Sequence, residues 1–343
     1  MAISTDVATA PVTQDRAPVL AIRDLNASFY TRRGEVRAVR DVSFSLRQGE
    51  TLALVGESGS GKTATAMSIL RMLPGKARVT GGEILFEGRD LVRMSERQMA
   101  RIRGRHIGLI PQDPAASLNP LMTVGQHVTE LLGVHLDMKG RAARDRTIEL
   151  LQAVGIPEPE RRFDAYPHQM SGGMRQRVMI ALAIACHPAL LLADEPTTAL
   201  DPTIQSQILE LIATLSREMD TATILITHNL GIVAGVCDRV AVMYGGRIVE
   251  VAPRDQLFAE PRHPYTLGLL QCVPRVDRIT AGTFQSIPGA PPDLAGPIPG
   301  CSFAPRCSFA TELCHGESPP LTPALGDHRA ACWHQDRLRT VGP

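Results

Sequence analysis

The octapeptide GESGSGKT, residues 56–63, is the part of the sequence whose residue types point most directly to chemistry. It fits the pattern G-x-x-x-x-G-K-[ST], in which glycines let backbone N–H groups wrap around phosphate oxygens. Lys62 adds a positive charge near the β- and γ-phosphates of a nucleotide, and the Thr63 hydroxyl can bind Mg²⁺. The predicted nucleotide-binding residues of this loop are Gly56, Ser58, Gly59, Ser60, Gly61, Lys62 and Thr63.

A second candidate is LLLADEP, residues 190–196, in which four apolar residues indicate a buried strand. Asp194 follows at the C-terminal end, the edge of a parallel sheet where a phosphate loop also lies. We therefore expect Asp194 to hold Mg²⁺ and Glu195 to polarise the water that attacks the γ-phosphate.

A third candidate is MSGGMRQR, residues 170–177, which precedes a helical pattern. Ser171, Gly172 and Gly173 form a second helix start that can receive an anion. A helix cap explains this stretch taken singly. One active site, however, does not need two phosphate-binding helix starts about 110 residues apart. The stretch therefore predicts a second surface that faces a nucleotide.

An α/β framework is required to hold these groups in place. Apolar runs bounded by turns predict strands, and residues 62 to about 72 have a helical pattern that Pro74-Gly75 ends. Residues 114–185 lack strand signals and predict a helical insert, whereas Gly245-Gly246 predicts a hairpin turn. The predicted strands are residues 51–55, 82–86, 106–110, 190–193, 223–227, 239–244 and 247–251.

Composition limits the class of protein. The chain has 343 residues, of which 44% are hydrophobic and 21% charged, typical of a globular protein with a core. Its 36 basic and 35 acidic residues give no general signal for nucleic acid. No apolar run reaches the roughly 18 residues of a membrane span, so we expect a soluble protein that meets a membrane through partners. Residues 1–18 are expected to form a disordered lead-in without a signal peptide.

The order and spacing of six motifs over residues 19–255 resemble an ABC-transporter ATPase. They are residues 56–63, Gln112 in LIPQDP, Ser171-Gly172-Gly173, Asp194-Glu195, ALD at residues 199–201, and His228 in LITHNL. The resemblance implies a P-loop (RecA-like) core, an antiparallel β subdomain and the helical insert. It also implies a head-to-tail dimer in which each ATP lies between one phosphate loop and the other subunit's Ser-Gly-Gly signature.

The resemblance further implies individual roles. Gln112 would sense the γ-phosphate and share in binding Mg²⁺ with Thr63 and Asp194. His228 would contact the γ-phosphate and organise the water activated by Glu195. Asp201 would lie at the dimer seam. Phe29 fits the family position of the adenine-stacking aromatic, although Tyr30 is adjacent. The signature reads MSGGM where the family usually has LSGGQ, but its Ser-Gly-Gly centre is intact.

Within this family the chain is most similar to the ATP-binding subunits of dipeptide/oligopeptide importers, in stretches such as YPHQMSGGMRQRVMIALAIACHP and the later HPYTLGLLQCVP. That resemblance implies an ATPase domain at residues 19–260 and a loop-rich extension at 261–343. The implied partners are a second, non-identical ATPase subunit, two membrane permeases and an extracytoplasmic solute-binding protein, with the chain on the cytoplasmic face of the inner membrane. The alternative is a soluble ABC ATPase that acts on ribosomes or DNA.

Four cysteines of the extension, Cys301, Cys307, Cys314 and Cys332, are spaced C-x5-C-x6-C-x17-C. Disulfides are not expected beside a cytosolic ATP site. Four thiolates suit zinc, but zinc sites usually contain close C-x2–4-C pairs, which this stretch lacks. Four thiolates are also the ligand set of a [4Fe–4S] cluster, and the resemblance implies such a cluster in this extension. Zinc or no metal stay open as alternatives.

Overall fold

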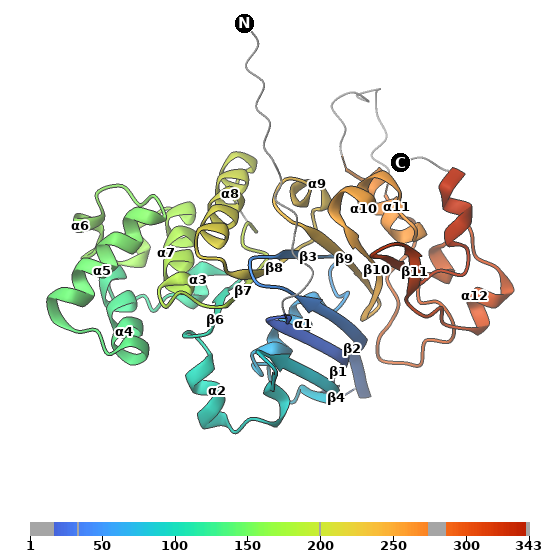
Figure 1. The fold of residues 1–343 in the computed structure, drawn as a ribbon, viewed down its shortest axis with the longest axis horizontal. Helices are drawn as coiled ribbons and strands as arrows, with labels where there is room; N and C mark the ends of the chain where they lie inside the picture. The colour runs from blue at the N-terminus through green and yellow to red at the C-terminus, as the bar shows by residue number, and fades with distance from the viewer. Residues whose placement is uncertain (1–16, 33, 199, 274–285, 341–343) are drawn as a thin grey trace, which may run out of the picture.

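An eight-stranded sheet runs through the centre of the molecule in the computed structural model, which describes residues 17–32, 34–198, 200–273 and 286–340 (Figure 1). The predicted lead-in, residues 1–18, lies outside these ranges except for Ala17 and Pro18. Strand order is β11-β12-β10-β9-β3-β8-β7-β6. The strands are β3 Thr51–Val55, β6 Ile107–Ile110, β7 Leu190–Asp194, β8 Ala222–Thr227, β9 Arg239–Tyr244, β10 Arg247–Pro253, β11 Thr322–Leu325 and β12 His328–Ala330.

Strands β6, β7, β8, β3 and β9 pair in parallel, so their carboxyl ends lie at one edge of the sheet. The register sets Val55 beside Thr227 and Asp194 beside Ile226. Predicted functional segments follow β3, β6, β7 and β8 at this edge, because residues that leave parallel strands emerge at a common edge. The predicted strand at 51–55 is confirmed, as is the hairpin of β9 and β10 around Gly245-Gly246.

A smaller antiparallel sheet has the order β2-β1-β4-β5, which confirms the expected antiparallel β subdomain. Its residues Leu20, Ile22 and Leu25 are fully or almost fully buried and join one core with Leu52 and Leu54 of β3. The packing of this sheet against β3 and the adjoining helix holds the phosphate-loop strand from one side. Its strands are β1 Leu20–Thr31, β2 Gly34–Leu46, β4 Arg78–Phe86 and β5 Arg89–Asp90.

The predicted helical insert forms the group of helices farthest from the C-terminal segment (Figure 1). No strand interrupts residues 114–185, all of which the structure describes. Val178, Ile180 and Ile184 of its last helix are buried beside β7 and join the insert to the central sheet. The helices are α3 Pro114–Ser117, α4 Val124–Leu136, α5 Gly140–Ala153, α6 Pro159–Arg162 and α7 Gly172–Ile184.

The remaining helices flank the sheets. The helix after the phosphate loop ends at Ile69, three residues before the predicted end, because Arg71 turns into a left-handed conformation with φ of 51°. These helices are α1 Lys62–Ile69, α2 Glu96–Ile102, α8 Pro202–Glu218, α9 Leu230–Val233, α10 Arg254–Ala259, α11 Pro264–Gln271 and α12 Glu312–Gly316.

The C-terminal segment continues the central sheet, since β12 pairs with β10 and β11 pairs with β12. The fully buried Glu250 of β10 accepts a hydrogen bond from His328 Nε2 at 2.7 Å. The same carboxylate also accepts from the backbone N–H groups of Arg262 and His263. A buried carboxylate needs such donors, so this cluster fastens the extension to the core.

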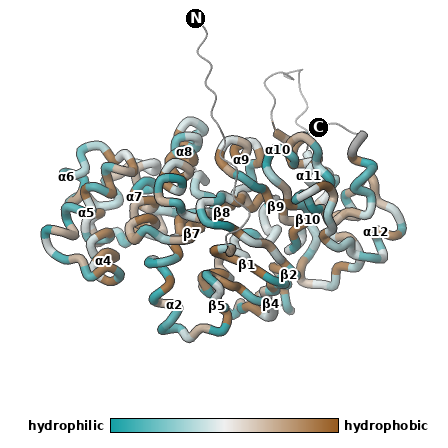
Figure 2. Tube along the Cα trace, viewed as in Figure 1, coloured by the Kyte–Doolittle hydropathy of each residue, from teal (hydrophilic) through white to brown (hydrophobic). Residues whose placement is uncertain are grey.

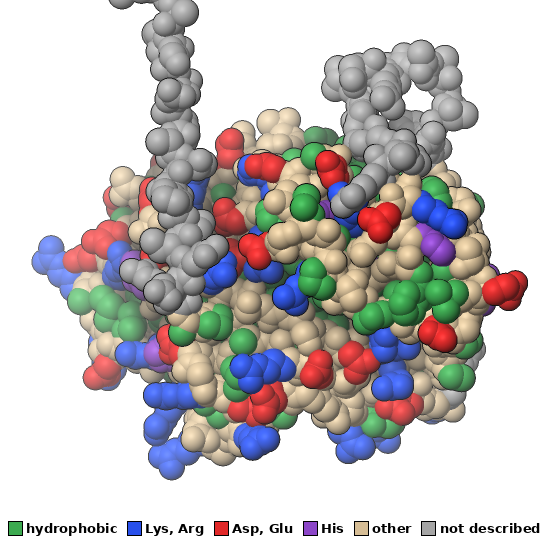
Figure 3. Space-filling model, turned by 45° about the vertical axis from the view of Figure 1, so that its right-hand side comes forward, with side chains coloured by type: hydrophobic (Ala, Val, Ile, Leu, Met, Phe, Trp, Pro, Cys, Tyr) green, Lys and Arg blue, Asp and Glu red, His purple; other side chains and the backbone are tan. Residues whose placement is uncertain are grey.

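Apolar residues gather along the central strands and the inner helix faces (Figure 2). On the face drawn in Figure 3, positive and negative side chains are interspersed, in keeping with the nearly balanced charge of the sequence. Within the described ranges, no helix is long and apolar enough to cross a membrane.

Candidate nucleotide site and cysteine pocket

The phosphate loop leaves β3 at Gly56 and enters α1 at Lys62. Gly56 and Gly61 have φ values of 155° and 106°, a region that other residues rarely adopt. A Cβ atom at Gly56 would lie 2.2 Å from the Met243 carbonyl oxygen, and one at Gly61 would lie 2.4 Å from that of Ala38. The loop therefore requires glycine at both positions for conformation and for space.

Two buried side chains of the loop, those of Lys62 and Ser60, can donate hydrogen bonds to an anion. Lys62 Nζ donates to the carbonyl oxygens of Gly56 at 2.8 Å and of Glu57 at 3.0 Å. Burial lowers the pKa of Lys62, and the negative charges of Glu195, Asp194 and Glu57 oppose that shift. The buried Ser60 hydroxyl has no hydrogen-bond partner within the described ranges. Donors that lack a full set of partners favour the arrival of phosphate oxygens.

Thr63 and Asp194 meet as the sequence predicts. The Thr63 hydroxyl donates to Asp194 Oδ1 at 3.0 Å, although 131 positions separate the two residues. Burial raises the pKa of Asp194, and the hydrogen bond from Thr63 opposes the shift. Both side chains offer oxygen atoms, the ligands that Mg²⁺ prefers, beside a phosphate-binding loop. The donor set fits a magnesium ion that completes its shell with phosphate oxygens and water.

Glu195 lies at the centre of a hydrogen-bonded group. Gln112 Nε2 donates to Glu195 Oε2 at 3.2 Å, and His228 Nδ1 lies 3.3 Å from Glu195 Oε1. Thr198 also donates to Oε2, at 3.0 Å. Glu195 has a φ of 45°, so the chain turns sharply as it leaves β7. Gln112 and His228, which follow the separate strands β6 and β8, thus converge with Thr198 on one carboxylate that is still partly exposed to water.

The signature residues lie apart from this group. Ser171 caps α7 by accepting a hydrogen bond from the backbone N–H of Met174, and Gly172 and Gly173 approach the start of α8. Asp201 caps α8 by accepting from Ile204 N at 3.0 Å. Ser171, Gly172 and Asp201 are exposed. Their arrangement leaves both helix starts open to a ligand or partner outside this chain.

The aromatic candidates lie side by side on β1. Phe29 is half-buried and pairs with Val36, whereas Tyr30 is exposed and packs under the Arg78 guanidinium at 4.8 Å. Adjacent strand residues point to opposite faces, so only one of the two rings can face a given ligand.

Three residues beside the phosphate loop were not predicted from the sequence, and two of them contact the third, Glu57. Glu57 occupies a variable position of the loop motif, and Arg306 and Tyr265 belong to the C-terminal segment. The Arg306 guanidinium pairs with the Glu57 carboxylate, and the Tyr265 hydroxyl accepts from Glu57 N. No short-range sequence pattern predicts contacts between residues more than 200 positions apart. The only sequence signal was the presence of an arginine, Arg306, inside the cysteine-rich stretch.

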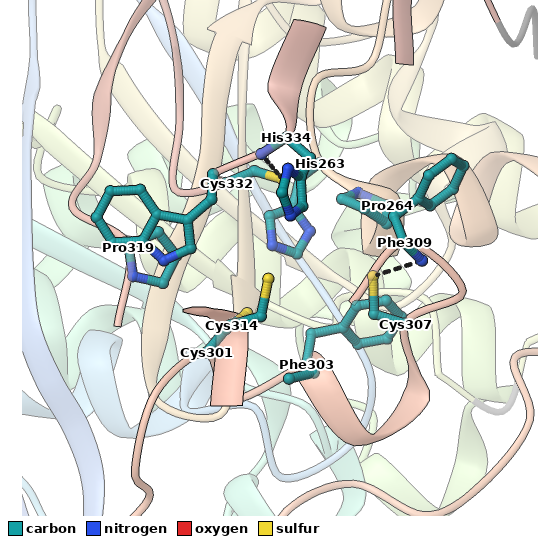
Figure 4. Close-up of a pocket in the computed structure, with 12 residues that line it drawn as sticks. His263, Pro264, Cys301, Phe303, Cys307, Phe309, Cys314, Pro319, Cys332 and His334 are labelled. Atoms are coloured by element: carbon teal, nitrogen blue, oxygen red, sulfur yellow. Dashed lines mark hydrogen bonds between the residues drawn. The ribbon is translucent and has the colours of Figure 1, made fainter. Parts of the chain in front are cut away.

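The four cysteines of the extension line one pocket with Phe303, Phe309 and other largely apolar groups (Figure 4). All four are free thiols. Burial raises the pKa of Cys301 and Cys307, and that of Cys332 to about 12. The backbone N–H of Phe309 donates to Cys307 Sγ at 3.4 Å, and that of His334 donates to Cys332 Sγ at 3.3 Å.

The pocket does not resemble a site for a single metal ion. In the described part of the chain, no three or more His, Cys, Asp or Glu side chains are grouped so that they could hold such an ion. His328 is engaged with Glu250, and His334 Nε2 lies 3.0 Å from the Thr311 hydroxyl. The described residues therefore give no support to the expected [4Fe–4S] cluster or to the zinc alternative.

The fold and the site together define an ATP-hydrolysing cassette. Residues 39–198 match the model of the ABC transporter family. Solved cassettes have the same fold: MJ0796, a bacterial ABC transporter cassette described as dimeric, gives a TM-score of 0.62 at 26% identity over 68% of this chain and 98% of its own. The cbiO1 protein of Clostridium perfringens gives 0.62 at 28% identity over 77% of this chain and 98% of its own.

The relatives narrow the class. Residues 249–314 match the C-terminal region of oligopeptide/dipeptide transporters. The oligopeptide transport ATP-binding protein OppD of Bacillus subtilis is 50% identical over 95% of this chain and 92% of its own. The dipeptide transport protein DppD of that species is 51% identical over 93% and 95%, and Escherichia coli OppD is 46% identical over 96% and 97%. The chain belongs to the ATP-binding subunits of the oligopeptide/dipeptide ABC transporters, and it is an ATPase. The comparisons lend no support to the alternative of a ribosome- or DNA-acting protein.

Proposed function

We propose that this chain hydrolyses ATP to drive the import of dipeptides, oligopeptides or related small solutes through membrane permease partners. The observation that carries the proposal is the convergence of Gln112 and His228 on Glu195, next to the Thr63–Asp194 contact. The relatives at about 50% identity are named for oligopeptide and dipeptide transport, which supports the class of solute.

In the proposed mechanism, backbone N–H groups of residues 56–61 and the start of α1 bind the phosphates. Lys62 turns from its carbonyl partners to the β- and γ-phosphates, where its charge offsets theirs. Thr63, Asp194 and Gln112 hold Mg²⁺, which supplies positive charge beside the phosphate oxygens. Phe29 stacks against the adenine.

Glu195 accepts a hydrogen bond from the attacking water and polarises it toward the γ-phosphorus. His228 Nδ1 lies 3.3 Å from the same carboxylate, and we propose that His228 contacts the γ-phosphate. Gln112 links Glu195 to the start of the helical insert, since α3 follows only two positions later. The presence of the γ-phosphate can thus alter the position of the insert.

We infer a dimer of ATPase subunits in which the partner's phosphate loop faces Ser171, Gly172 and Gly173, with Asp201 at the seam. The exposure of Ser171, Gly172 and Asp201 at the starts of α7 and α8 supports this arrangement. The second subunit is a homologous and non-identical ATPase. Two permeases and an extracytoplasmic binding protein complete the transporter, which places this chain at the cytoplasmic face of the membrane.

The deciding experiment co-expresses the chain with candidate permeases, purifies the complex and reconstitutes it in proteoliposomes with the binding protein. We expect ATP-dependent uptake of a labelled peptide, and loss of uptake when Glu195 is replaced by Gln. Co-purification with nucleic acid and no association with permeases would contradict the proposal.

We also propose that Cys301, Cys307, Cys314 and Cys332 hold a [4Fe–4S] cluster. Four free thiols around one apolar pocket, two of them receiving backbone N–H bonds, support a ligand set for such a cluster. A bound cluster would keep the thiolates charged despite their burial.

Anaerobic purification tests the cluster. We expect a brown protein with absorbance at about 400 nm and about four iron atoms per chain. Cys301→Ser should lose colour and iron, whereas Cys272→Ser, which alters a cysteine outside the pocket, should keep both. A colourless protein, or one that holds zinc instead, would overturn this part of the proposal.

A further inference from the structure

A buried arginine of the C-terminal segment holds the phosphate loop by a two-pronged ion pair. Arg306 Nη1 lies 2.7 Å from Glu57 Oε2, and Arg306 Nη2 lies 3.0 Å from Glu57 Oε1. The Arg306 side chain is 4% exposed and that of Glu57 28%. Two parallel charge-assisted bonds in a partly buried place fix orientation as well as distance.

Arg306 is itself held firmly from the other side. Its Nε donates to the Pro288 carbonyl oxygen at 2.8 Å, and Nη2 donates to that of Ile287 at 3.1 Å. Nη1 also donates to the Tyr244 hydroxyl at 3.2 Å. The Glu57 contact is the main cause that raises the pKa of Arg306, so the guanidinium stays charged. Arg306 therefore presents a fixed positive charge to the loop.

Tyr265 holds the same loop residue through its backbone. The Tyr265 hydroxyl accepts a hydrogen bond from Glu57 N at 2.8 Å. Tyr265 is fully buried in a core that includes Phe303 of the extension and Val55 of β3, the strand that leads into the loop. The Glu57 carbonyl oxygen in turn accepts from Lys62 Nζ and Ser60 N. The side chain, N–H and carbonyl of Glu57 are all engaged.

Charge makes the Arg306 contact relevant to nucleotide binding. Glu57 lies in an anion-binding loop, and its negative charge is felt at Lys62. An unpaired carboxylate there would repel the phosphates of an incoming nucleotide. Arg306 offsets that charge and holds the carboxylate toward the extension.

We propose that Arg306 is a positioning residue for ATP: it keeps the Glu57 carboxylate away from the phosphates and so makes nucleotide affinity depend on the C-terminal extension. The proposal rests on the assignment of residues 56–63 as the ATP-binding loop and does not require the cluster. By this proposal the C-terminal extension affects ATP affinity through Arg306, the residue directly before Cys307.

The test measures the Kd of a fluorescent ATP analogue and the KM and kcat for ATP in the full-length chain. Arg306→Met should raise Kd and KM about tenfold and change kcat by less than about twofold, because the loss acts on binding. Glu57→Gln should change KM by less than about threefold, and the double variant should return to within about threefold of the wild type. Arg306→Lys, which keeps the charge without the fork, should be intermediate.

Arg247→Met is the matched control. Arg247 also links the extension to the core, through Ser318 and Asp41, but its side chain does not contact the phosphate loop. It should leave KM unchanged. If Arg306→Met keeps wild-type affinity, or if the double variant binds as weakly as Arg306→Met alone, the proposal is wrong. Should Arg306→Met fail to fold, wild-type KM in Arg306→Gln, which also removes the charge, would overturn it equally.

Lys62→Ala separates this inference from the assignment of the loop. Loss of binding in Lys62→Ala together with wild-type affinity in Arg306→Met would reject only the role of Arg306. Retained binding in Lys62→Ala would reject the loop assignment itself.

Discussion

The nucleotide site and the cysteine pocket are built in opposite ways. Thr63, Gln112, Asp194, Glu195 and His228 come from segments far apart in the chain and meet because parallel strands end at one edge. The four pocket cysteines come from residues 301–332, near the antiparallel end of the same sheet; Cys314 lies in the short helix α12 and the other three lie outside helices and strands. In the first site polar groups already contact one another; in the second, the thiols line an apolar space (Figure 4).

The difference concerns what each site needs from a ligand. Regular strands and helices hold the catalytic groups in place. The free-energy cost of ordering them when ATP binds is therefore small. The extension has few regular elements, and four thiols around one pocket gain more from a ligand that binds them together. Arg306 and the Glu250–His328 contact join the two regions, so a perturbation of one can be measured at the other.

The largest effect is expected at the nucleotide site. Glu195→Gln should lower kcat about 10³-fold, because the amide cannot accept the proton of the attacking water, while ATP binding persists. The measurement is steady-state phosphate release beside equilibrium ATP binding. Glu210→Gln, which changes an exposed carboxylate of α8, should behave as the wild type. Near-normal turnover in Glu195→Gln would mean that another group activates the water.

An intermediate effect is expected where the extension joins the sheet. His328→Leu removes one of three donors to the buried Glu250 and should destabilise the fold by about 2 kcal/mol. Urea unfolding measures the loss. His328→Gln retains a donor and should lose less. Equal stability of the Leu variant and the wild type would show that β12 does not depend on this contact.

The smallest effect is a gain in stability at the nucleotide site. Burial raises the pKa of Asp194, so the folded protein binds its proton more tightly than the unfolded chain does. The charged Asp194 carboxylate therefore destabilises the nucleotide-free fold at neutral pH. The stability that protonated Asp194 contributes is present at low pH and is lost as the pH rises through the raised pKa. Asp194→Asn should increase the Tm of the nucleotide-free protein by about 2 °C at neutral pH.

The advantage of Asp194→Asn should shrink as the pH falls toward the raised pKa of Asp194, because the wild-type carboxylate then becomes neutral. Thermal unfolding between about pH 7 and about pH 4 measures it. Asp145→Asn, an exposed carboxylate of α5, should show no such trend. A Tm gain that is constant with pH would point to packing instead of charge.

The sequence by itself determined the class of protein, the strand at residues 51–55, the hairpin around Gly245-Gly246 and the place of Asp194 beside the phosphate loop. These were predictable because glycine-rich turns, buried strand ends and helix starts are local patterns with a known chemical use. The end of α1 was misplaced because the left-handed turn at Arg71 is compensated by contacts of its side chain with the backbone of residues 91 and 94.

Only the tertiary structure decided how the extension meets the core. Arg306 and Glu57 are 249 positions apart, and His328 and Glu250 are 78 apart, so neither pair has a sequence period that could reveal it. Both contacts depend on β12 joining β10 and on Tyr265 and Phe303 packing beside β3. The physical reason is that a buried polar or charged group is costly unless a partner lies beside it. The fold decides which group that partner is, however far apart the two residues are in the sequence.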